Sequence, residues 1–286
     1  MVDNVVKPVS ALTVDVEDYF HVAAFEKNIS PKNWNSMPVR VEKNTHRLLD
    51  LFDEHDAKAT FFLLGWVAER FPGLVKEIHQ RGHEVASHGY NHTKATQQSQ
   101  QEFAQDVRAT KALLEDLSGA EVFGYRAPSF SIDKTNEWAF AELKKAGYLY
   151  SSSTYPVKHD LYGTPDWPQQ PYMRPEGIWE CPMPILNLAG KQLPIAGGGY
   201  FRLLPYWLSK RFINRYLDST PSPYMFYFHP WEIDPEQPRV KDASLKSKFR
   251  HYVNLKRMET KLGYLLQDYC WQSLHQVYAK SLAKHI

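Results

Sequence analysis

Short apolar runs alternate along this chain with longer segments in which apolar residues recur every three or four positions. The apolar runs predict buried strands at 11–16, 59–64, 83–88, 121–126, 148–153, 178–185 and 224–229. The periodic segments predict helices at 40–55, 72–82, 99–117, 133–145, 205–217 and 252–269. Strands that alternate with helices indicate parallel strands joined by right-handed crossovers.

About seven strand–helix units predict an α/β architecture, a single barrel related to the eight-unit (β/α) barrel. An open doubly wound sheet is the alternative. The Pro-rich segment 155–175 is expected to be a long loop and not a domain boundary, because the strand–helix pattern resumes after it. A loop of that length in a compact domain is usually functional or disordered. We therefore expect residues 1–286 to form one domain.

Composition narrows the class of protein. The chain has 34 Lys and Arg against 32 Asp and Glu, and this near-neutrality argues against a surface for duplex nucleic acid. Two cysteines are too few for a disulfide-stapled domain, and reduced core thiols are expected. No stretch approaches the ~18 apolar residues of a membrane span. The first residues do not resemble a signal peptide, so a cytoplasmic enzyme is expected.

Unusual polar residues follow the predicted strands. Asp15, Glu17 and Asp18 lie at the end of the first strand, and a pair of histidines lies at the end of the third. Arg126 follows the fourth, and His229 ends the seventh. Because the carboxyl ends of parallel strands meet at one face, these side chains are expected to converge on one cleft.

The histidine pair, His88 and His92, has a spacing that suits a divalent cation. Two imidazoles four residues apart lie on one face of a helical turn, and both can reach one ion at about 2.1 Å. A lone pair of this kind is more often two ordinary histidines. The acidic group at residues 15–18 can supply a third ligand, which favours a catalytic metal site with open positions.

The acidic group itself suits acid–base chemistry. Asp15 and Glu17 project to the same side of a strand, so one carboxylate can bind metal while the other takes a proton from water. A solvated acidic turn or a helix cap is the alternative, but Asp15 interrupts an apolar strand, where an unpaired charge is costly. Arg126 can hold a carboxylate through two hydrogen bonds. His229 has the pKa range of a general acid for an amine leaving group.

A glycine turn at 197–199 precedes a helical pattern and lacks the context of a phosphate-binding loop. Close approach of the backbone to a substrate is expected there. Tyr200, Phe201 and Trp231 are the candidate substrate contacts. A long groove lined by Trp167, Tyr200 and Trp231 would indicate a saccharide substrate.

These residues together resemble the polysaccharide deacetylases, the carbohydrate-esterase group with the NodB-homology domain. Residues 13–18 resemble the first motif of that group, 87–92 the second, 126–128 the third and 227–229 the last. The runs at 15–20, 197–205 and 228–235 are similar to a subfamily found with exopolysaccharide-biosynthesis and exosortase genes. That subfamily carries a C-terminal extension of the DUF3473 type, expected here at about 236–286 and packed on the barrel.

The resemblance implies a distorted (β/α)₇ barrel and metal-dependent hydrolysis of an N-acetyl group on a carbohydrate. His88 and His92 would bind the metal, commonly zinc. Asp15 would be the general base and Arg126 would hold it. His229 would protonate the departing amine.

The resemblance also assigns Ser129 to the substrate, because its backbone N–H could help bind the oxyanion. Oligomeric state stays open between a monomer and a homo-oligomer.

Two positions depart from the family pattern. The usual first motif has a metal-binding Asp where this chain has Val16, so the third ligand must move to Glu17 or Asp18. Glu17 is preferred because it shares a face with Asp15.

The second departure concerns the acid histidine. Ser151 stands near the place of an Asp that usually tunes this histidine, and Asp160 and Asp234 are weak candidates for its role.

The leading hypothesis is a metal-dependent sugar N-deacetylase. The alternatives are a related C–N hydrolase for a cyclic amide, a ureide or a formamide, favoured by a compact closed pocket, and a carbohydrate-binding homologue without catalysis.

Overall fold

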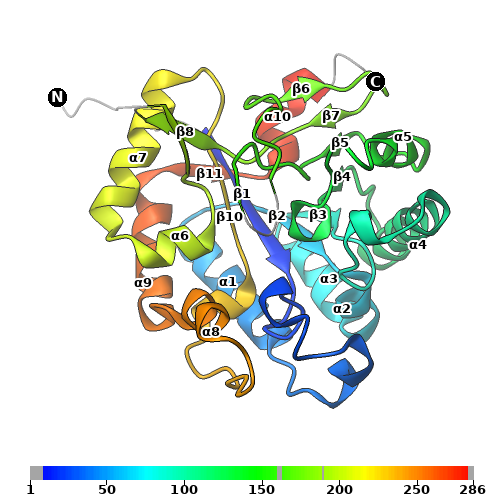
Figure 1. Cartoon of the computed structure of the whole chain (residues 1–286), viewed down its shortest axis with the longest axis horizontal. Coiled ribbons are helices and arrows are strands. Elements are labelled where there is room, and N and C mark those ends of the chain that lie inside the picture. Colours follow the sequence, from blue (N-terminus) through cyan, green and yellow to red (C-terminus); the bar gives the residue numbers. More distant parts are fainter. Residues whose placement is uncertain (1–8, 160–162, 189, 283–286) are drawn as a thin grey trace.

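The computed structural model describes residues 9–159, 163–188 and 190–282, so Asp160 lies outside the described residues. Its centre is a curled nine-stranded sheet with the order β10-β1-β2-β3-β4-β5-β7-β6, and β11 lies beside the first residues of β1 (Figure 1). The strands are β1 (Val9–Val16), β2 (Thr60–Leu63), β3 (Glu84–Ser87), β4 (Gly124–Tyr125), β5 (Tyr150–Ser151), β6 (Tyr172–Met173), β7 (Trp179–Glu180), β10 (Met225–Phe228) and β11 (Cys270–Gln272). Every pair is parallel except β6 with β7.

The sheet curls into an incomplete barrel. Within the described residues β7 pairs with β6 and not with β10, and the antiparallel hairpin of β8 (Ile185–Leu188) and β9 (Lys191–Pro194) forms a separate sheet. Gly197 then makes an isolated bridge to Tyr227 of β10. The seven parallel strands from β10 to β7 confirm the predicted α/β class and the distorted (β/α)₇ barrel.

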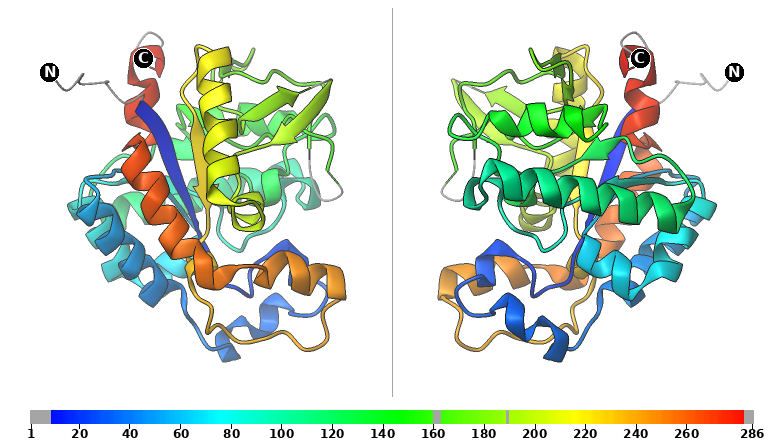
Figure 2. Two further views of the ribbon diagram at one scale, coloured as in Figure 1. Left: turned by 90° about the vertical axis from the view of Figure 1, so that its left-hand side faces the viewer. Right: turned by 90° about the vertical axis from the view of Figure 1, so that its right-hand side faces the viewer.

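Helices cover the outside of the sheet, and the views of Figure 2 show them around the barrel. They are α1 (Val41–Glu54), α2 (Gly65–Arg70), α3 (Pro72–Gln80), α4 (Gln100–Ser118), α5 (Trp138–Lys145), α6 (Gly198–Leu203), α7 (Tyr206–Ser219), α8 (Leu245–Tyr252), α9 (Leu255–Asp268) and α10 (Leu274–Leu282). The 3₁₀ turns are η1 (Ala23–Phe25), η2 (Pro31–Ser36), η3 (Ala95–Gln97), η4 (Pro128–Phe130) and η5 (Pro230–Ile233).

Local sequence explains the regular elements. β1 is buried from Ser10 to Val16, as expected for a parallel strand covered on both faces. Ser99 and Glu102 form a capping box at the start of α4. Gly119 ends α4 in the left-handed conformation at φ 71°, which glycine adopts without steric cost.

Several predicted elements are shorter or divided in the structure. The fourth strand is only Gly124–Tyr125, and the predicted strand at 178–185 is divided into β7 and the start of β8. The predicted helix at 252–269 is α9, which begins at Leu255. The apolar pattern does not mark these limits because pairing partners decide where strand geometry stops.

The C-terminal residues pack on the barrel. The backbone carbonyl of Trp271 in β11 accepts from Lys58 N–H at 3.1 Å, and Leu274 N–H donates to Thr60 Oγ1 at 2.8 Å. No helix of the described chain is long and apolar enough to span a bilayer. Cys181 and Cys270 are both unbridged, as expected.

The carboxyl ends of the strands point to the lower side of Figure 1, where the segment after β1 and helix α8 lie. Phe25 of η1 contacts the rings of His251 and Tyr252, with ring centroids 4.6 and 5.9 Å away. This contact joins the N-terminal loop and the C-terminal extension on the face where the polar residues were expected.

Candidate active site

A cavity of about 140 Å³ opens at the carboxyl ends of the strands. The expected convergence is present in the structure. The residues that line this cavity are Asp15, Glu17, Val22, Ala23, His88, His92, Ala127, Ser129, Phe130, Tyr227, His229 and Trp231.

Glu17, His88 and His92 form the candidate metal centre. One potential ligand atom from each of the three lies within 4.8 Å of the other two. The carboxylate of Glu17 lies between two imidazoles, with Oε2 3.0 Å from His92 Nε2 and Oε1 3.0 Å from His229 Nε2. Glu17 is therefore the member of the acidic group that reaches the histidine pair.

The donor set fits a divalent cation. Glu17 Oε2 is buried beside His92 Nε2, and a buried carboxylate needs a positive partner to offset its charge. His88 Nδ1 lies 2.8 Å from the carbonyl oxygen of Arg126, so a proton on Nδ1 leaves Nε2 as the ligand atom. Two imidazoles and one carboxylate are the ligands of many catalytic zinc sites.

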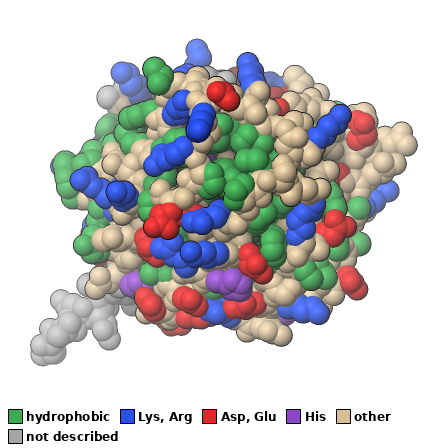
Figure 3. All heavy atoms as spheres, turned by 90° about the horizontal axis from the view of Figure 1, so that it is seen from below, with side chains coloured by type: hydrophobic (Ala, Val, Ile, Leu, Met, Phe, Trp, Pro, Cys, Tyr) green, Lys and Arg blue, Asp and Glu red, His purple; other side chains and the backbone are tan. Residues whose placement is uncertain are grey.

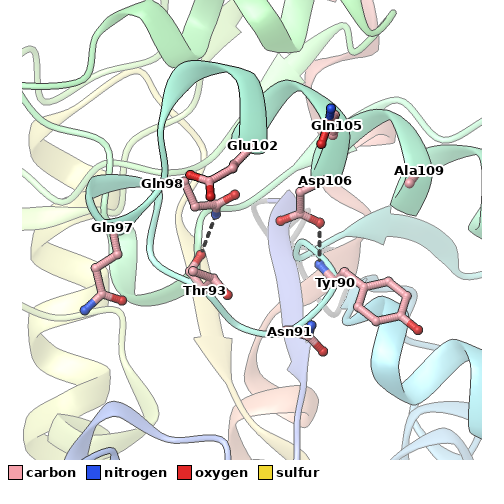
Figure 4. Close-up of a pocket in the computed structure, with 9 residues that line it drawn as sticks. All are labelled: Tyr90, Asn91, Thr93, Gln97, Gln98, Glu102, Gln105, Asp106 and Ala109. Carbon is pink, nitrogen blue, oxygen red and sulfur yellow. Dashed lines mark hydrogen bonds between the residues drawn. The ribbon is translucent and has the colours of Figure 1, made fainter.

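The loop that carries the two histidines is anchored by α4. Gly89 has φ 73° and His92 has φ 54°, so two residues of this short loop are left-handed. The Oδ1 atom of Asp106 accepts from Tyr90 N–H at 2.8 Å (Figure 4). The same oxygen accepts from Thr110 Oγ1 at 3.0 Å. The Tyr90 contact fixes the backbone of the loop two residues before His92.

The structure does not place Asp18, the alternative ligand, with the histidine pair. Its Oδ2 accepts from the backbone N–H groups of Arg40 at 2.6 Å and Val41 at 2.8 Å, and its Oδ1 accepts from its neighbour Tyr19. The carboxylate therefore satisfies the first N–H groups of α1 instead of facing the cavity. Burial nevertheless raises the pKa of Asp18 to about 6.

Asp15 and Arg126 form a buried ion pair. Arg126 Nη1 donates to Asp15 Oδ1 at 2.7 Å and contacts Thr13 Oγ1 at 2.9 Å. The same guanidinium donates through Nε to the Ser152 carbonyl at 3.1 Å and through Nη2 to Ser152 Oγ at 3.0 Å. Arg126 has no solvent exposure, so the charge of Asp15 is its main compensation. The predicted contact between these two residues is present, but through one hydrogen bond and not the two that were expected.

His229 has a partner that the sequence reasoning missed. Its Nδ1 lies 2.9 Å from Oε1 of Glu232, three residues further on in η5. The other oxygen of Glu232 accepts from Arg202 Nε of α6 at 2.7 Å. Glu232 is thus the carboxylate beside His229, where Asp160 and Asp234 were the candidates. Spacing along a turn was the available signal, since i and i+3 lie on one face.

The structure corrects the suggestion that Asp234 tunes His229. It accepts from Arg40 Nε at 2.8 Å and from Asn44 Nδ2 at 3.2 Å, which ties η5 to α1. Ser151 donates to Ser153 Oγ at 2.8 Å. Neither contact involves His229.

Within the glycine turn at 197–199, Gly198 lies against the carboxylate of Glu232, whereas Gly199 lines the second hollow beside the cavity. A Cβ atom on Gly198 would meet both carboxylate oxygens of Glu232. Gly198 therefore allows a close approach of its backbone to Glu232, and the expected approach of this turn to a substrate stays a prediction.

Arg202, Glu232, His229 and Glu17 form a row of alternating basic and acidic side chains, each in contact with the next. Burial alone would raise the pKa of Glu17, but the charges of His92 and His229 outweigh it and hold that pKa well below its usual range. Burial disfavours the charged form of His229, yet Glu17 and Glu232 raise its pKa to about 10. Burial lowers the pKa of His88 to about 4, so this ring is a neutral potential ligand.

The predicted substrate contacts separate into different environments. Ser129 and Trp231 line the cavity, and Ser129 has φ 56° within η4. Tyr200 lines a second hollow that adjoins the cavity. Phe201 is corrected, because it is buried and packs on Phe226 with ring centroids 5.0 Å apart.

The expectation that Trp167 lines a substrate groove is corrected as well. It lies beside Phe140, with ring centroids 6.1 Å apart, and beside the guanidinium of Arg174. It lines neither hollow.

Comparisons with known proteins concern the family and the fold. The model of the family described as polysaccharide deacetylase matches residues 25–151, and a model described as a domain of unknown function, DUF3473, matches residues 152–279. The first begins after Asp15 and Glu17, and the second begins well before residue 236 and includes β10.

Two curated relatives are similar over part of their length. A peptidoglycan-N-acetylglucosamine deacetylase of Bacillus cereus is 35% identical over 104 residues, covering 36% of this chain and 47% of that protein. The peptidoglycan-N-acetylglucosamine deacetylase PgdA of Listeria monocytogenes is 37% identical over 90 residues, covering 32% of this chain and 19% of that protein. The matched segment is thus less than half of either relative.

Solved structures share the fold. A structure from Mycobacterium smegmatis, assigned provisionally by its description to the polysaccharide deacetylases, superposes with TM-score 0.61 at 18% identity, covering 97% of this chain and 91% of the other. A peptidoglycan N-acetylglucosamine deacetylase superposes with TM-score 0.51 at 17% identity, covering 94% and 87%. These likenesses support the barrel topology.

Proposed function

We propose that this chain is a polysaccharide deacetylase, a metal-dependent hydrolase that removes N-acetyl groups from a carbohydrate; the family model that matches residues 25–151 supports this. One observation carries the proposal: Glu17, His88 and His92 form a ligand cluster beside a cavity that Asp15 and His229 also line. The curated relatives named as N-acetylglucosamine deacetylases support an amide substrate on a sugar. Val16 does not remove the ligand set, because Glu17 completes it.

Glu17, His88 and His92 would hold the cation, and zinc suits two imidazoles and one carboxylate. A bound divalent ion lowers the pKa of water and polarises a carbonyl oxygen.

Asp15 accepts a proton from the attacking water. Its oxygen Oδ1 is held by Arg126, which fixes the carboxylate at the cavity wall. A base must lie within hydrogen-bond reach of the proton that it takes, and burial of the pair restricts Asp15 to that position.

His229 delivers a proton to the departing nitrogen. Glu232 accepts a hydrogen bond from Nδ1, which leaves a proton on Nε2 at the cavity side when the imidazole is charged. Arg202 in turn holds Glu232 and fixes the orientation of the ring. The backbone N–H of Ser129 is our candidate donor to the oxyanion, because Ser129 lines the same cavity.

The surroundings favour a saccharide over a small cyclic amide. The catalytic cavity shares Val22, Tyr227 and Trp231 with a second hollow of about 380 Å³, so a substrate can extend beyond the reacting group. The ring of Trp231 is buried and stacks on His229 and His251, so the second hollow and not the face of this ring supports an extended substrate. We extend the proposal to saccharides of exopolysaccharide biosynthesis, supported by the DUF3473 match and the subfamily resemblance.

The test is release of acetate from a chitooligosaccharide by the purified chain. We expect activity that chelator abolishes and that Zn²⁺ or another divalent cation restores. Hydrolysis that is unaffected by exhaustive chelation would exclude the metal-dependent reaction. Binding of the oligosaccharide without turnover at any divalent cation would indicate a carbohydrate-binding homologue.

A further inference from the structure

The hollow beside the catalytic cavity has apolar walls from two helices. Leu203 at the end of α6 and Phe249 in α8 lie on it, and Trp231 joins it to the catalytic cavity. Its volume is about 380 Å³. The hollow therefore lies between the catalytic groups and the C-terminal extension.

Large apolar side chains at this place are exposed. Leu245 is 86% exposed, Phe249 is 60% exposed and Leu203 is 47% exposed. Leu245 and Phe249 are four residues apart in α8 and so lie on one face of the helix. We name these three residues the α8 patch. Exposed apolar side chains grouped beside a hollow indicate an interaction surface more often than isolated ones do.

Positive charge accompanies the α8 patch. Residues 239–250 contain five Lys or Arg and one Asp, whereas Lys and Arg exceed Asp and Glu by only two in the whole chain. Figure 3 shows this side of the molecule, with hydrophobic side chains gathered among Lys and Arg side chains. Leu and Phe on one helix face with basic residues beside them are typical of helices that lie in a membrane interface.

We propose that the α8 patch docks the protein on an anionic lipid surface, with the mouth of the catalytic cavity beside the membrane. An acidic headgroup layer complements the basic segment, and Leu245 and Phe249 reach the acyl boundary. A symmetric contact between two copies would bring the two basic segments together, which is unfavourable. The docking surface goes beyond the proposed activity and would serve a saccharide that is made or held at a membrane.

The test is co-sedimentation of the full chain with vesicles of phosphatidylcholine alone or mixed in equal parts with phosphatidylglycerol. We expect binding to the mixed vesicles and much weaker binding to phosphatidylcholine. In Leu245→Ser/Phe249→Ser the lipid concentration for half-binding is expected to rise at least about tenfold, because two apolar anchors are lost. Tyr264→Ser is the matched control, since Tyr264 is 51% exposed in α9 but does not line the hollow.

Equal binding by the double variant and the wild-type chain would overturn the proposal, as would absence of binding to mixed vesicles. Light scattering is measured in parallel, and a dimer that dissociates in the double variant would assign the patch to contact between copies instead. Acetate release from a soluble chitooligosaccharide is assayed without vesicles in Leu245→Ser, where it is expected to be unchanged. Failure of vesicle binding and failure of hydrolysis are thus separate results.

Discussion

Replacement of Glu232 by Gln tests whether a carboxylate outside the predicted set tunes the acid histidine. The change removes a charged partner 2.9 Å from His229 Nδ1 and leaves the side chain nearly the same size. A hydrogen bond to a charged group contributes about 1.5–3 kcal/mol. Each ~1.4 kcal/mol of barrier is a factor of ten in rate, so kcat is expected to fall roughly 10- to 150-fold.

The pH profile of kcat reports the same change independently. The pKa of His229 is raised by Glu17 and Glu232, and His229 acts in its protonated form, so activity is lost as pH rises through that pKa. Removing the charge of Glu232 lowers the pKa of His229. The alkaline limb of the profile is therefore expected to move to lower pH in Glu232→Gln.

Asp234→Asn is the matched control. It also removes a buried carboxylate paired with an arginine, but its partners are Arg40 and Asn44. It is expected to lower the melting temperature without shifting the pH profile. The reasoning fails if Glu232→Gln keeps kcat within about threefold, or if both variants lose rate with the alkaline limb unmoved.

Three further predictions concern the candidate ligand and base, Gly198, and the buried histidine His83. His88→Ala is expected to lose bound metal and activity together, whereas Asp15→Asn keeps its metal and loses roughly 10²–10⁴-fold in kcat; metal analysis beside acetate release separates them. Gly198→Ala displaces the carboxylate of Glu232 and is expected to reproduce the pH shift of Glu232→Gln; a wild-type profile in a folded variant would contradict this. Burial lowers the pKa of His83 to about 4, so its contribution to stability is present above about 6.5 and is lost as pH falls toward 4. Urea unfolding across this range is expected to show a weaker pH dependence in His83→Gln, and equal slopes would refute the assignment.

Much of the site follows from order along the chain. Asp15, His88 and His229 stand at the ends of predicted strands, and parallel strands bring those ends to one edge whatever the details of the loops. The seven apolar runs and the helices between them were sufficient for the barrel class for the same reason. Each parallel pairing requires a crossover, and few arrangements of crossovers bury all the strands.

Strand limits and loop directions could not be read in this way. The residues at 178–185 form one apolar run, but the run belongs to two strands. It begins in β7 of the barrel and ends at the start of the β8–β9 hairpin. A hydrophobic pattern reports burial, but it does not distinguish one buried neighbour from another.

The sequence by itself determined that carboxylates, imidazoles and an arginine meet at one end of a parallel barrel. Only the tertiary structure decided which carboxylate does what. Asp18 accepts hydrogen bonds from the N–H groups of Arg40 and Val41, whereas Glu17 contacts the histidines. One oxygen of Glu232 faces His229, while Arg202, thirty residues earlier, holds the other oxygen. A side chain beyond a strand end takes its direction from partners distant in sequence, because burial makes every unpaired polar group costly.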